Sequence, residues 1–448
     1  MSAAGGSAPG RDEPGRDEPG RDPPGPELTS SEPAAAPASL DAVTTARARM
    51  VEALRVSGRI PSPAVQAAFL DVPRHLFVPG LEPAAAYQDE ALVIKYGPDG
   101  LPVSSSSQPA MMAIMLEQLG LRPGHRVLEI GTGTGYNAAV MAHIVGPAGR
   151  VITIDIDDEL VSRARVSLAE AGYDAIEART GDGGFGAPAD APFDRIIVTA
   201  GAWDIAPAWL DQLGQAGRLV LPLAVRAIQL SVGLERRPGG DCWTATSAFR
   251  CGFVRMAGAF AGPEVFRPLG HGTGLFVQAD DGHLVDGRAL ATALAAPGVD
   301  VPAGIRAITR EELSDVDLWL TLTEPGLSRL TVMDTGTGRS SSGPLLPYGG
   351  LASRGSERGQ LGVSGLAGSW LSGAEPPAEI VLRGYGRGGR ALASHLAARV
   401  LAWDTLGRPG TADLCLVACP PGAQLPVAAG QIVLSRPHVR LAAGWPVR

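Results

Sequence analysis

The stretch RVLEIGTGTGYNAAV places three glycines at alternate positions, Gly131, Gly133 and Gly135, after the acidic Glu129. Glycine lets a backbone turn sharply and approach a ligand closely. A second acidic residue, Asp155, lies twenty positions after the last glycine, where it can accept hydrogen bonds from the hydroxyls of a ribose. Taken alone, this spacing fits the binding of either a dinucleotide or S-adenosylmethionine.

The elements that must position these residues form a strand, loop, helix and strand in that order. Residues 126–130 (RVLEI) are a short apolar run that predicts a strand, and a helix is expected to begin near Tyr136. Residues 151–154 (VITI) predict a second strand that ends in Asp155. This order is typical of a βαβ unit and favours a ligand-binding loop over a glycine turn without a ligand.

Two details favour the sulfonium cofactor over a dinucleotide. The motif has an acidic residue followed by G-x-G-x-G, rather than the G-x-G-x-x-G of dinucleotide-binding folds. Glu129, just ahead of the loop, would repel a phosphate and attract the ammonium of an amino-acid moiety. We therefore expect S-adenosyl-L-methionine as the cofactor, bound by Glu129, Gly131, Gly133, Gly135 and Asp155.

Motifs of a known family surround this unit. The segments VLEIGTGTGYNAAVMAHIVGPAGRV, RTGDGGFGAPADAPFDRIIVTAGA and LDQLGQAGRLVLPL resemble those of the protein-L-isoaspartate O-methyltransferases. The segments AFLDVPRHLFVPG and AYQDEALVI resemble their N-terminal portion, so the resemblance covers residues 40–235. It implies an α/β fold with a seven-stranded, doubly wound, mostly parallel methyltransferase sheet. It also implies that Asp155 holds the ribose and that Asp182, followed by Gly183, lies near the adenine.

A serine-rich segment, LPVSSSSQPAMMAIM, precedes the glycine loop. By composition alone, such a run is typical of a flexible linker. In the family that the chain resembles, a segment ending in Ser-Gln-Pro lies over the cofactor, and its serine helps to hold the substrate carboxylate. Ser107, Gln108 and Pro109 match that segment. The resemblance thus implies a pocket wall with Ser107 and the adjacent Ser106 as catalytic residues, held in place by a helix over residues 110–119.

The chain also departs from the family pattern. Residues 104–106 are serines where the family usually has Gln-Thr-Ile or Gln-Thr-Leu, which changes the region that recognises an isoaspartyl linkage. The loop GAWDIAP, residues 201–207, carries Trp203 where small residues are common. Trp203 either fills the core or forms part of a peptide-binding rim.

Methyl transfer to a carboxylate requires few acid–base residues. The carboxylate is already deprotonated at neutral pH, so attack on a sulfonium methyl needs alignment and exclusion of water rather than a general base. The backbone N–H after an aspartyl methyl ester can then close a five-membered succinimide, which water opens at either carbonyl. The lack of a His–Asp or Cys–His motif therefore does not argue against this chemistry.

Composition and charge exclude several classes of function. The net charge of −8, with no stripe of Lys or Arg, argues against a nucleic-acid partner. The sequence has neither a run of eighteen apolar residues nor a signal peptide, so we expect no membrane partner and a cytoplasmic location. The four cysteines show no metal-binding spacing, so we expect no metal and predict reduced, buried thiols.

The sequence predicts three regions. Residues 1–38 repeat a GRDEP unit that cannot bury enough apolar surface to fold, and are expected to form a disordered tail. Residues 39–260 form the expected catalytic domain. Residues 275–448 form an expected C-terminal accessory domain of mixed α+β type. Because it carries no catalytic motif, its predicted role is peptide recognition.

Within the accessory region, apolar patterns predict individual elements. Residues 316–323 (VDLWLTLT) and 327–334 (LSRLTVMD) predict strands, and residues 389–406 predict a helix. Two further strands are expected over residues 414–420 and 431–445.

The segment SSSSQP together with a C-terminal domain of this type resembles one branch of the family. That branch is associated with ribosomally synthesised, modified peptides in actinobacteria, including lanthipeptide and graspetide pathways. The resemblance implies methylation of an ordinary aspartate in a cyclised precursor peptide, giving an aspartimide or isoaspartate. The alternative is repair of isoaspartyl residues in damaged proteins. A third interpretation, a regulatory module that binds the cofactor without turnover, is disfavoured because Ser107, Asp155 and Asp182 are intact.

Overall fold

The computed structural model describes eleven stretches of the 448-residue chain: residues 40–98, 100–263, 265–268, 275–279, 287–307, 309–324, 327–332, 350–353, 361–366, 378–386 and 388–446. The tail predicted for residues 1–38 lies outside them. Residues 40–448 form one compact unit.

The N-terminal helices lead into a hairpin that contains the serines. The helices are α1 (Leu40–Val56), α2 (Pro63–Asp71), the 3₁₀ turn η1 (Arg74–Phe77) and α3 (Pro83–Ala86). Strand β1 (Leu92–Tyr96) then pairs antiparallel with β2 (Pro102–Ser106). The serine segment, defined here as residues 104–107, therefore belongs mainly to a strand. It is not a linker.

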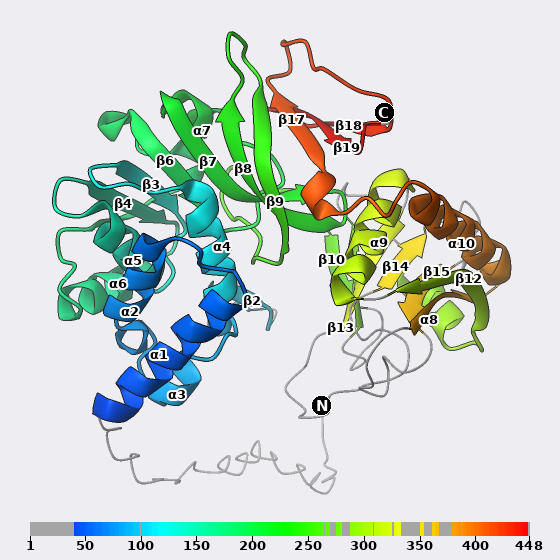
Figure 1. Cartoon of the computed structure of the whole chain (residues 1–448), viewed down its shortest axis with the longest axis horizontal. Helices are drawn as coiled ribbons and strands as arrows, with labels where there is room; N and C mark the ends of the chain where they lie inside the picture. Colours follow the sequence, from blue (N-terminus) through cyan, green and yellow to red (C-terminus); the bar gives the residue numbers. More distant parts are fainter. Residues whose placement is uncertain are drawn as a thin grey trace, which may run out of the picture. The chain divides into compact units, whose positions relative to one another are not determined.

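A ten-stranded sheet forms the centre of the molecule, in the order β18-β19-β17-β9-β8-β7-β6-β3-β4-β5 (Figure 1). Its parallel strands are β3 (Arg126–Ile130), β4 (Arg150–Asp155), β5 (Glu177–Thr180), β6 (Phe193–Val198) and β7 (Leu213–Val225). Strands β8 (Ile228–Arg236) and β9 (Trp243–Cys251) continue it antiparallel. These seven strands confirm the predicted methyltransferase fold, and the two predicted strands of the βαβ unit match β3 and β4.

Helices pack on the parallel strands and fix the loops at their ends. The helices are α4 (Pro109–Leu119), α5 (Tyr136–Val145), α6 (Asp158–Glu170) and the short α7 (Pro207–Asp211). Helix α4 contacts β6 to β9, whereas α5 contacts β3 and β4, and α6 contacts β4 and β5. Strands β3 and β4 are apolar and mostly buried, as expected for parallel strands covered by helices.

The last three strands of the chain extend the same sheet beyond β9. They are β17 (Cys415–Cys419), β18 (Gln431–Ser435) and β19 (Arg440–Gly444). Strand β17 pairs antiparallel with β9 through Val417–Thr244 and Ala418–Trp243. Two strands were predicted here, and β17 matches the first, but residues 431–445 form two antiparallel strands, β18 and β19, instead of one. Their position in the large sheet also differs from the expected division, which placed residues 275–448 in a separate accessory domain.

The same strand pairing corrects the expectation of four reduced thiols. Cys242 and Cys419 form a disulfide across a sequence separation of 177 residues, while Cys251 and Cys415 are free. The pairing of Ala418 with Trp243 brings the two cysteines together, and this register is not visible in their spacing along the chain. Cys415 is exposed, which also differs from the predicted buried thiol.

The region between β9 and β17 contains two small sheets and three helices among the described residues. One sheet has β10 (Val265–Pro268), β11 (Leu275–Ala279), β13 (Leu327–Val332) and β14 (Gly350–Ser353). The other has β12 (Val299–Ala307), β16 (Ala378–Tyr385) and β15 (Leu361–Leu366). The helices are α8 (Gly287–Leu294), α9 (Arg310–Thr323) and α10 (Gly389–Thr405). Helix α10 confirms the prediction for residues 389–406.

The strand predicted over residues 316–323 is wrong, because this segment forms the second half of α9. A capping box between Thr309 and Glu312 starts the helix. Val316, Trp319 and Leu320 are buried at the three- and four-residue spacing of a helix face. Because most residues of this segment are apolar, the spacing typical of a helix could not be recognised in the sequence.

One apolar core connects the central sheet with the C-terminal elements. Trp243 of β9, Trp319 of α9, Trp403 of α10 and Trp445 after β19 belong to a single buried cluster. The rings of Trp319 and Trp445 lie 5.4 Å apart. Burying a large apolar side chain stabilises a fold by about 1.5–3 kcal/mol, so this core ties the C-terminal elements to the sheet.

Candidate functional site

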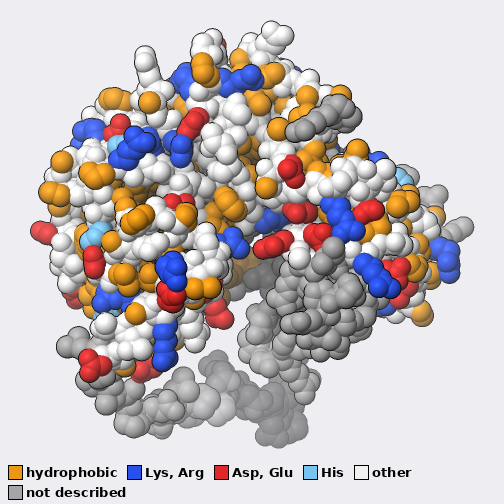
Figure 2. Space-filling view, in the orientation of Figure 1, with side chains coloured by type: hydrophobic (Ala, Val, Ile, Leu, Met, Phe, Trp, Pro, Cys, Tyr) orange, Lys and Arg blue, Asp and Glu red, His pale blue; other side chains and the backbone are white. Residues whose placement is uncertain are grey.

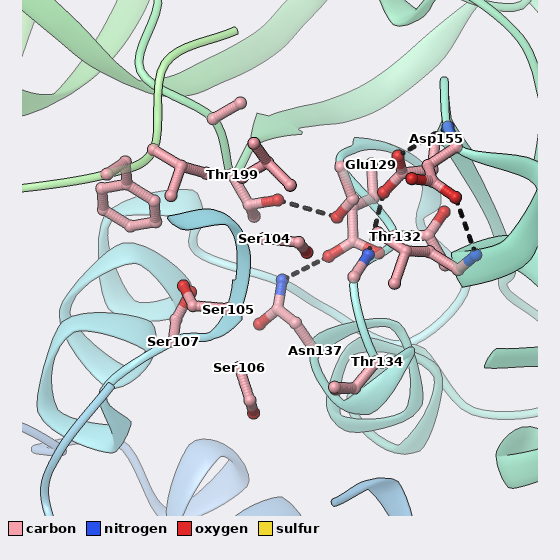
Figure 3. Close-up of a pocket in the computed structure, with 18 of the residues that line it drawn as sticks. Ser104, Ser105, Ser106, Ser107, Glu129, Thr132, Thr134, Asn137, Asp155 and Thr199 are labelled. Atoms are coloured by element: carbon pink, nitrogen blue, oxygen red, sulfur yellow. Dashed lines mark hydrogen bonds between the residues drawn. The ribbon is translucent and has the colours of Figure 1, made fainter. Parts of the chain in front are cut away.

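A cavity of about 270 Å³ lies at the carboxyl ends of β3 and β4, between these strands and the serine segment (Figure 3). We call it the central cavity. The serine segment lies on one side and the glycine loop on the other. The residues that line it include Ser106, Ser107, Glu129, Gly131, Gly133, Tyr136, Asn137, Asp155 and Thr199.

The glycine loop is shaped by backbone angles that favour glycine. Gly131 and Gly133 have φ values of +100° and +51°. A Cβ on Gly131 would overlap Thr199 Oγ1, and that hydroxyl donates a hydrogen bond of 2.8 Å to the Gly131 carbonyl. The loop is thus held against the end of β6, and a larger side chain at Gly131 would displace it.

Asp155 ends β4 and faces the loop. Its Oδ2 accepts a hydrogen bond of 3.0 Å from the Gly133 N–H, and its Oδ1 accepts one of 3.1 Å from the Asp157 N–H. These bonds fix the carboxylate at the cavity. Each carboxylate oxygen can accept a further hydrogen bond, so Asp155 retains the capacity to hold ribose hydroxyls.

Glu129 is fully buried beside the cavity. Its Oε1 accepts a hydrogen bond of 2.7 Å from Asn137 Nδ2, and its Oε2 accepts one of 2.7 Å from Thr153 Oγ1. Burial raises the pKa of Glu129 to about 7, against the opposing effect of these bonds. A cation in the cavity would favour the ionised carboxylate.

Three buried polar atoms around the cavity have no hydrogen-bond partner: Ser106 Oγ, Tyr136 Oη and Asn137 Oδ1. Buried polar groups in proteins are almost always hydrogen-bonded. Their grouping at one cavity indicates that a polar ligand completes them. Together with Glu129 and Asp155, this set of donors and acceptors fits S-adenosyl-L-methionine, which carries an ammonium, a carboxylate and a ribose.

A buried arginine lies directly behind the serine segment. Arg74 is fully buried; its Nη2 donates a hydrogen bond of 3.0 Å to the Ser107 carbonyl, and its Nε donates one of 2.8 Å to Ala86. Its guanidinium lies 5.1 Å from the Tyr136 ring centre. Burial lowers the pKa of Arg74. Arg74 therefore positions Ser107. Nothing in the sequence indicated this role, because the segment around Arg74 matched the family only as a whole.

Three predicted cofactor residues do not line the central cavity. Gly135 caps α5 with φ of +86° and packs against Leu168. Asp182 accepts hydrogen bonds from the N–H groups of Gly184 at 2.9 Å and Ala259 at 2.7 Å. Gly183 accepts one of 2.9 Å from Trp209 Nε1. The role of Asp182 near the adenine stays a prediction.

The loop after β9 also lines the cavity, through Phe253, Val254, Arg255 and Ala257, although no motif marked these residues. Gln229 holds this loop: its Oε1 accepts a hydrogen bond of 2.7 Å from the Phe253 N–H, and its Nε2 donates one of 3.3 Å to the Phe253 carbonyl. Ala259 is held by Asp182 as described. These loop residues are distant in sequence from the glycine motif, so only the folded sheet brings them to the site.

The described residues bear on two other functions, metal ligation and membrane spanning. They contain no group of three His, Cys, Asp or Glu side chains placed to hold a metal ion. Among the same residues, no helix is long and apolar enough to cross a membrane. Basic and acidic side chains are interspersed on the face of the molecule shown in Figure 2.

Comparisons with known proteins identify the family. Residues 45–259 match the family described as protein-L-isoaspartate(D-aspartate) O-methyltransferase. A protein-L-isoaspartate O-methyltransferase of Methanopyrus kandleri is 43% identical over 222 residues, which cover 49% of this chain and 95% of that protein. The chain belongs to the protein-L-isoaspartate O-methyltransferase family. Members of this family are enzymes that use S-adenosyl-L-methionine.

Further relatives give the same assignment. The enzyme of Hyperthermus butylicus is 44% identical over 228 residues, covering 49% of this chain and 91% of that protein. A solved protein-L-isoaspartate O-methyltransferase structure covers 83% of this chain and 96% of its own, at 22% identity and a TM-score of 0.45. The family match and the relatives in Methanopyrus kandleri and Hyperthermus butylicus confirm the family and the enzyme class that the motifs predicted. The family match ends at residue 259, before β10.

Proposed function

We propose that this family member methylates the side-chain carboxyl of an ordinary aspartate in a cyclised ribosomal peptide. The resulting methyl ester loses methanol as the following backbone nitrogen closes a succinimide, and hydrolysis of that ring gives isoaspartate. The observation that carries the proposal is that residues beyond the family match are built into the catalytic sheet and hold the loops of its site. The C-terminal region is assigned to peptide recognition.

The turn between β18 and β19 contacts the altered loop after β6. Asp204, which is 4% exposed, accepts hydrogen bonds at its Oδ2 from the His438 N–H at 2.9 Å and pairs with His438 Nδ1 at 3.0 Å. The Arg436 guanidinium lies 4.9 Å from the Trp203 ring centre. The unusual Trp203 thus packs against a residue from the C-terminal strands, which supports a site adapted to the added region.

The same turn reaches the loop after β9. The rings of His438 and Phe260 lie 5.1 Å apart, and those of Phe260 and Phe185 lie 5.9 Å apart. Four residues of this loop also line the central cavity, as described above. Selecting one ordinary aspartate among many requires contacts beyond the reacting group, and the C-terminal strands support a loop that can make them.

The chain's own residues would align the reaction and exclude water. Bound S-adenosyl-L-methionine supplies an electrophilic methyl group on its sulfonium. Asp155 would hold the ribose, while Glu129, with Asn137, would face the ammonium. Ser107, fixed by Arg74, and Ser106 would hold the substrate carboxylate, with the buried Arg74 charge favouring its ionised form. No residue has to remove a proton, because the carboxylate is the nucleophile.

Turnover with defined peptides tests the proposal. The full chain is incubated with S-adenosyl-L-methionine and a cyclised aspartyl peptide, its linear form, or linear isoaspartyl peptides. Mass spectrometry then follows the gain of a methyl group and the later loss of methanol. We expect the cyclised aspartyl peptide to react much faster than its linear form. Efficient turnover of isoaspartyl peptides alone would establish the repair function instead.

Repair is the second candidate, because the relatives that match residues 45–259 are named as isoaspartyl methyltransferases. Methyl transfer by the unaltered chain would exclude a module that only binds the cofactor, and a Ser107→Ala variant then tests the role of the serine segment in either enzyme. Loss of the serine hydroxyl should slow methyl transfer while leaving cofactor affinity nearly unchanged, because only alignment of the substrate is affected. Equal loss of both would assign the serine segment a purely structural role.

A further inference from the structure

A second cavity, of about 560 Å³, adjoins the central cavity. Val103 of the hairpin and the loop residues Phe253, Val254, Arg255 and Ala257 line both. The two cavities are therefore separated by no more than this shared wall. The volume lies within the range of about 300–1,000 Å³ that is typical of ligand sites.

The second cavity is lined partly by residues outside the family match. Gln278 of β11 and Arg329 of β13 both line it. They are direct register partners in the antiparallel pair, so their side chains project from the same face of the small sheet. The remaining lining is mainly apolar, with Leu101, Pro102, Ala227 and Ile228.

The charged groups of this cavity are basic. Arg255 and Arg329 line it, and among the described residues that line it none is Asp or Glu. Arg329 forms no ion pair within the described part of the chain. The nearby Arg250 is partly buried, and this burial lowers its pKa. Asp317 and Asp315 oppose that effect, whereas the charge of Arg329 lowers the pKa further. Among the described lining residues, the charged side chains are therefore both basic, and Arg329 is the one that the proposal uses.

We propose that the second cavity binds a carboxylate of the peptide substrate, distinct from the aspartate that is methylated. Arg329 pairs with it through its planar guanidinium, which matches a carboxylate in two parallel hydrogen bonds, and Gln278 lies beside the pair. This inference rests on the proposed function in one respect, namely that a peptide occupies the central cavity. The apolar lining accommodates the peptide segment between the two carboxylates.

Two sources supply the same chemistry: an Asp or Glu side chain of the peptide, or its C-terminal carboxylate. Three cyclised peptides distinguish them, each with one reactive aspartate. The first has a Glu outside the ring and an amidated C-terminus, the second has Gln and a free C-terminus, and the third has Gln and an amide. Three linear isoaspartyl peptides carry the same combinations of Glu or Gln with an amidated or free C-terminus.

The full chain is compared with Arg329→Ala, Arg329→Lys and the control Arg390→Ala, an exposed arginine on α10. We expect Arg329→Ala to raise KM about 10- to 100-fold for the carboxylate-bearing peptide, with kcat and cofactor affinity unchanged. The Lys variant should recover part of the loss. The Arg390→Ala control should leave KM unchanged for every peptide. For the peptide with neither carboxylate, KM should be the same in the Arg329→Ala variant as in the unaltered chain.

Direct peptide binding, measured by calorimetry, separates failure of this site from failure of the proposed function. Arg329-dependent binding of isoaspartyl peptides, without turnover of cyclised ones, would keep the site and refute the maturation function. Turnover of cyclised peptides with KM independent of both Arg329 and the carboxylates would overturn the site alone. If Arg329→Ala has a clearly lower melting temperature, the test uses Arg329→Lys instead, together with the KM values of the three peptides on the unaltered chain. These measurements still show whether a peptide carboxylate binds in the second cavity.

Discussion

The parallel and antiparallel halves of the central sheet are built from different parts of the chain. In the parallel half, β3, the glycine loop, α5 and β4 follow one another within residues 126–155, and they bring Glu129 and Asp155 to one cavity. In the antiparallel half, β9 is completed by strands that begin only at Cys415. The comparison indicates that the residues proposed to bind the cofactor lie close together in sequence, whereas the segments that support the loops proposed to face the peptide do not.

The largest test of this comparison is removal of residues 260–448. Truncation exposes the edge of β9 and the buried Trp243, removes Cys419 and His438, and leaves Cys242 without its partner. We expect loss of cooperative folding, measured by circular dichroism and melting. A truncated chain that melts cooperatively and binds the cofactor normally would show that the parallel half stands alone.

The disulfide within the antiparallel half, between Cys242 just before β9 and Cys419 at the end of β17, should contribute next. A cross-link that closes a loop of 177 residues restricts the unfolded chain, and typical disulfides stabilise by about 2–4 kcal/mol. Cys419→Ala should lower the free energy of unfolding by that amount in denaturant titration under oxidising conditions. The exposed free thiol gives the control, since Cys415→Ala should be neutral. Equal stability of both variants would mean that the bond adds nothing.

These differences explain which features could be predicted from the sequence. Strand β3 and the start of α5 were predicted because glycine spacing and apolar pattern act over a few residues. The pairing of β17 with β9, the Cys242–Cys419 bond and the contact of His438 with Asp204 depend on distant segments. No local pattern encodes that register. The strand predicted over residues 316–323 was wrong for another reason: a short apolar run fits a strand and a buried helix equally well.

Within the parallel half, Asp155 offers the sharpest test of cofactor binding. Asp155→Ala should lose about 1.5–3 kcal/mol of S-adenosyl-L-methionine affinity, the range for hydrogen bonds to a charged group. Calorimetry measures it directly. Asp174→Ala, at an exposed position before β5, should bind normally. Unchanged affinity in Asp155→Ala would remove the ribose contact from the assignment.

Cofactor affinity should also depend on pH through Glu129. Its pKa is raised to about 7 by burial, so the side chain is protonated below that pH and cannot attract an ammonium. We expect affinity to fall as pH drops through 7, by about tenfold between pH 7 and 6 at most. Calorimetry in buffers of different ionisation enthalpy should detect proton release on binding. Glu129→Gln should abolish this dependence, and a flat profile in the unaltered chain would contradict the contact.

The smallest expected effect tests whether the antiparallel half influences peptide binding or only stabilises the fold. His438→Ala removes one hydrogen bond to the buried Asp204 and the ring beside Phe260, and should cost about 0.5–1.5 kcal/mol of stability. If the turn positions the loop after β9, KM for the peptide should also rise several-fold, with cofactor affinity unchanged, and His438→Asn should recover part of the effect. His395→Ala provides the control, because it removes the contact of the exposed His395 on α10 with Glu324 at the end of α9, away from the loop after β9. A loss of stability with KM unchanged would confine the C-terminal strands to a structural role, and recognition of the peptide would then have to come from other parts of the chain.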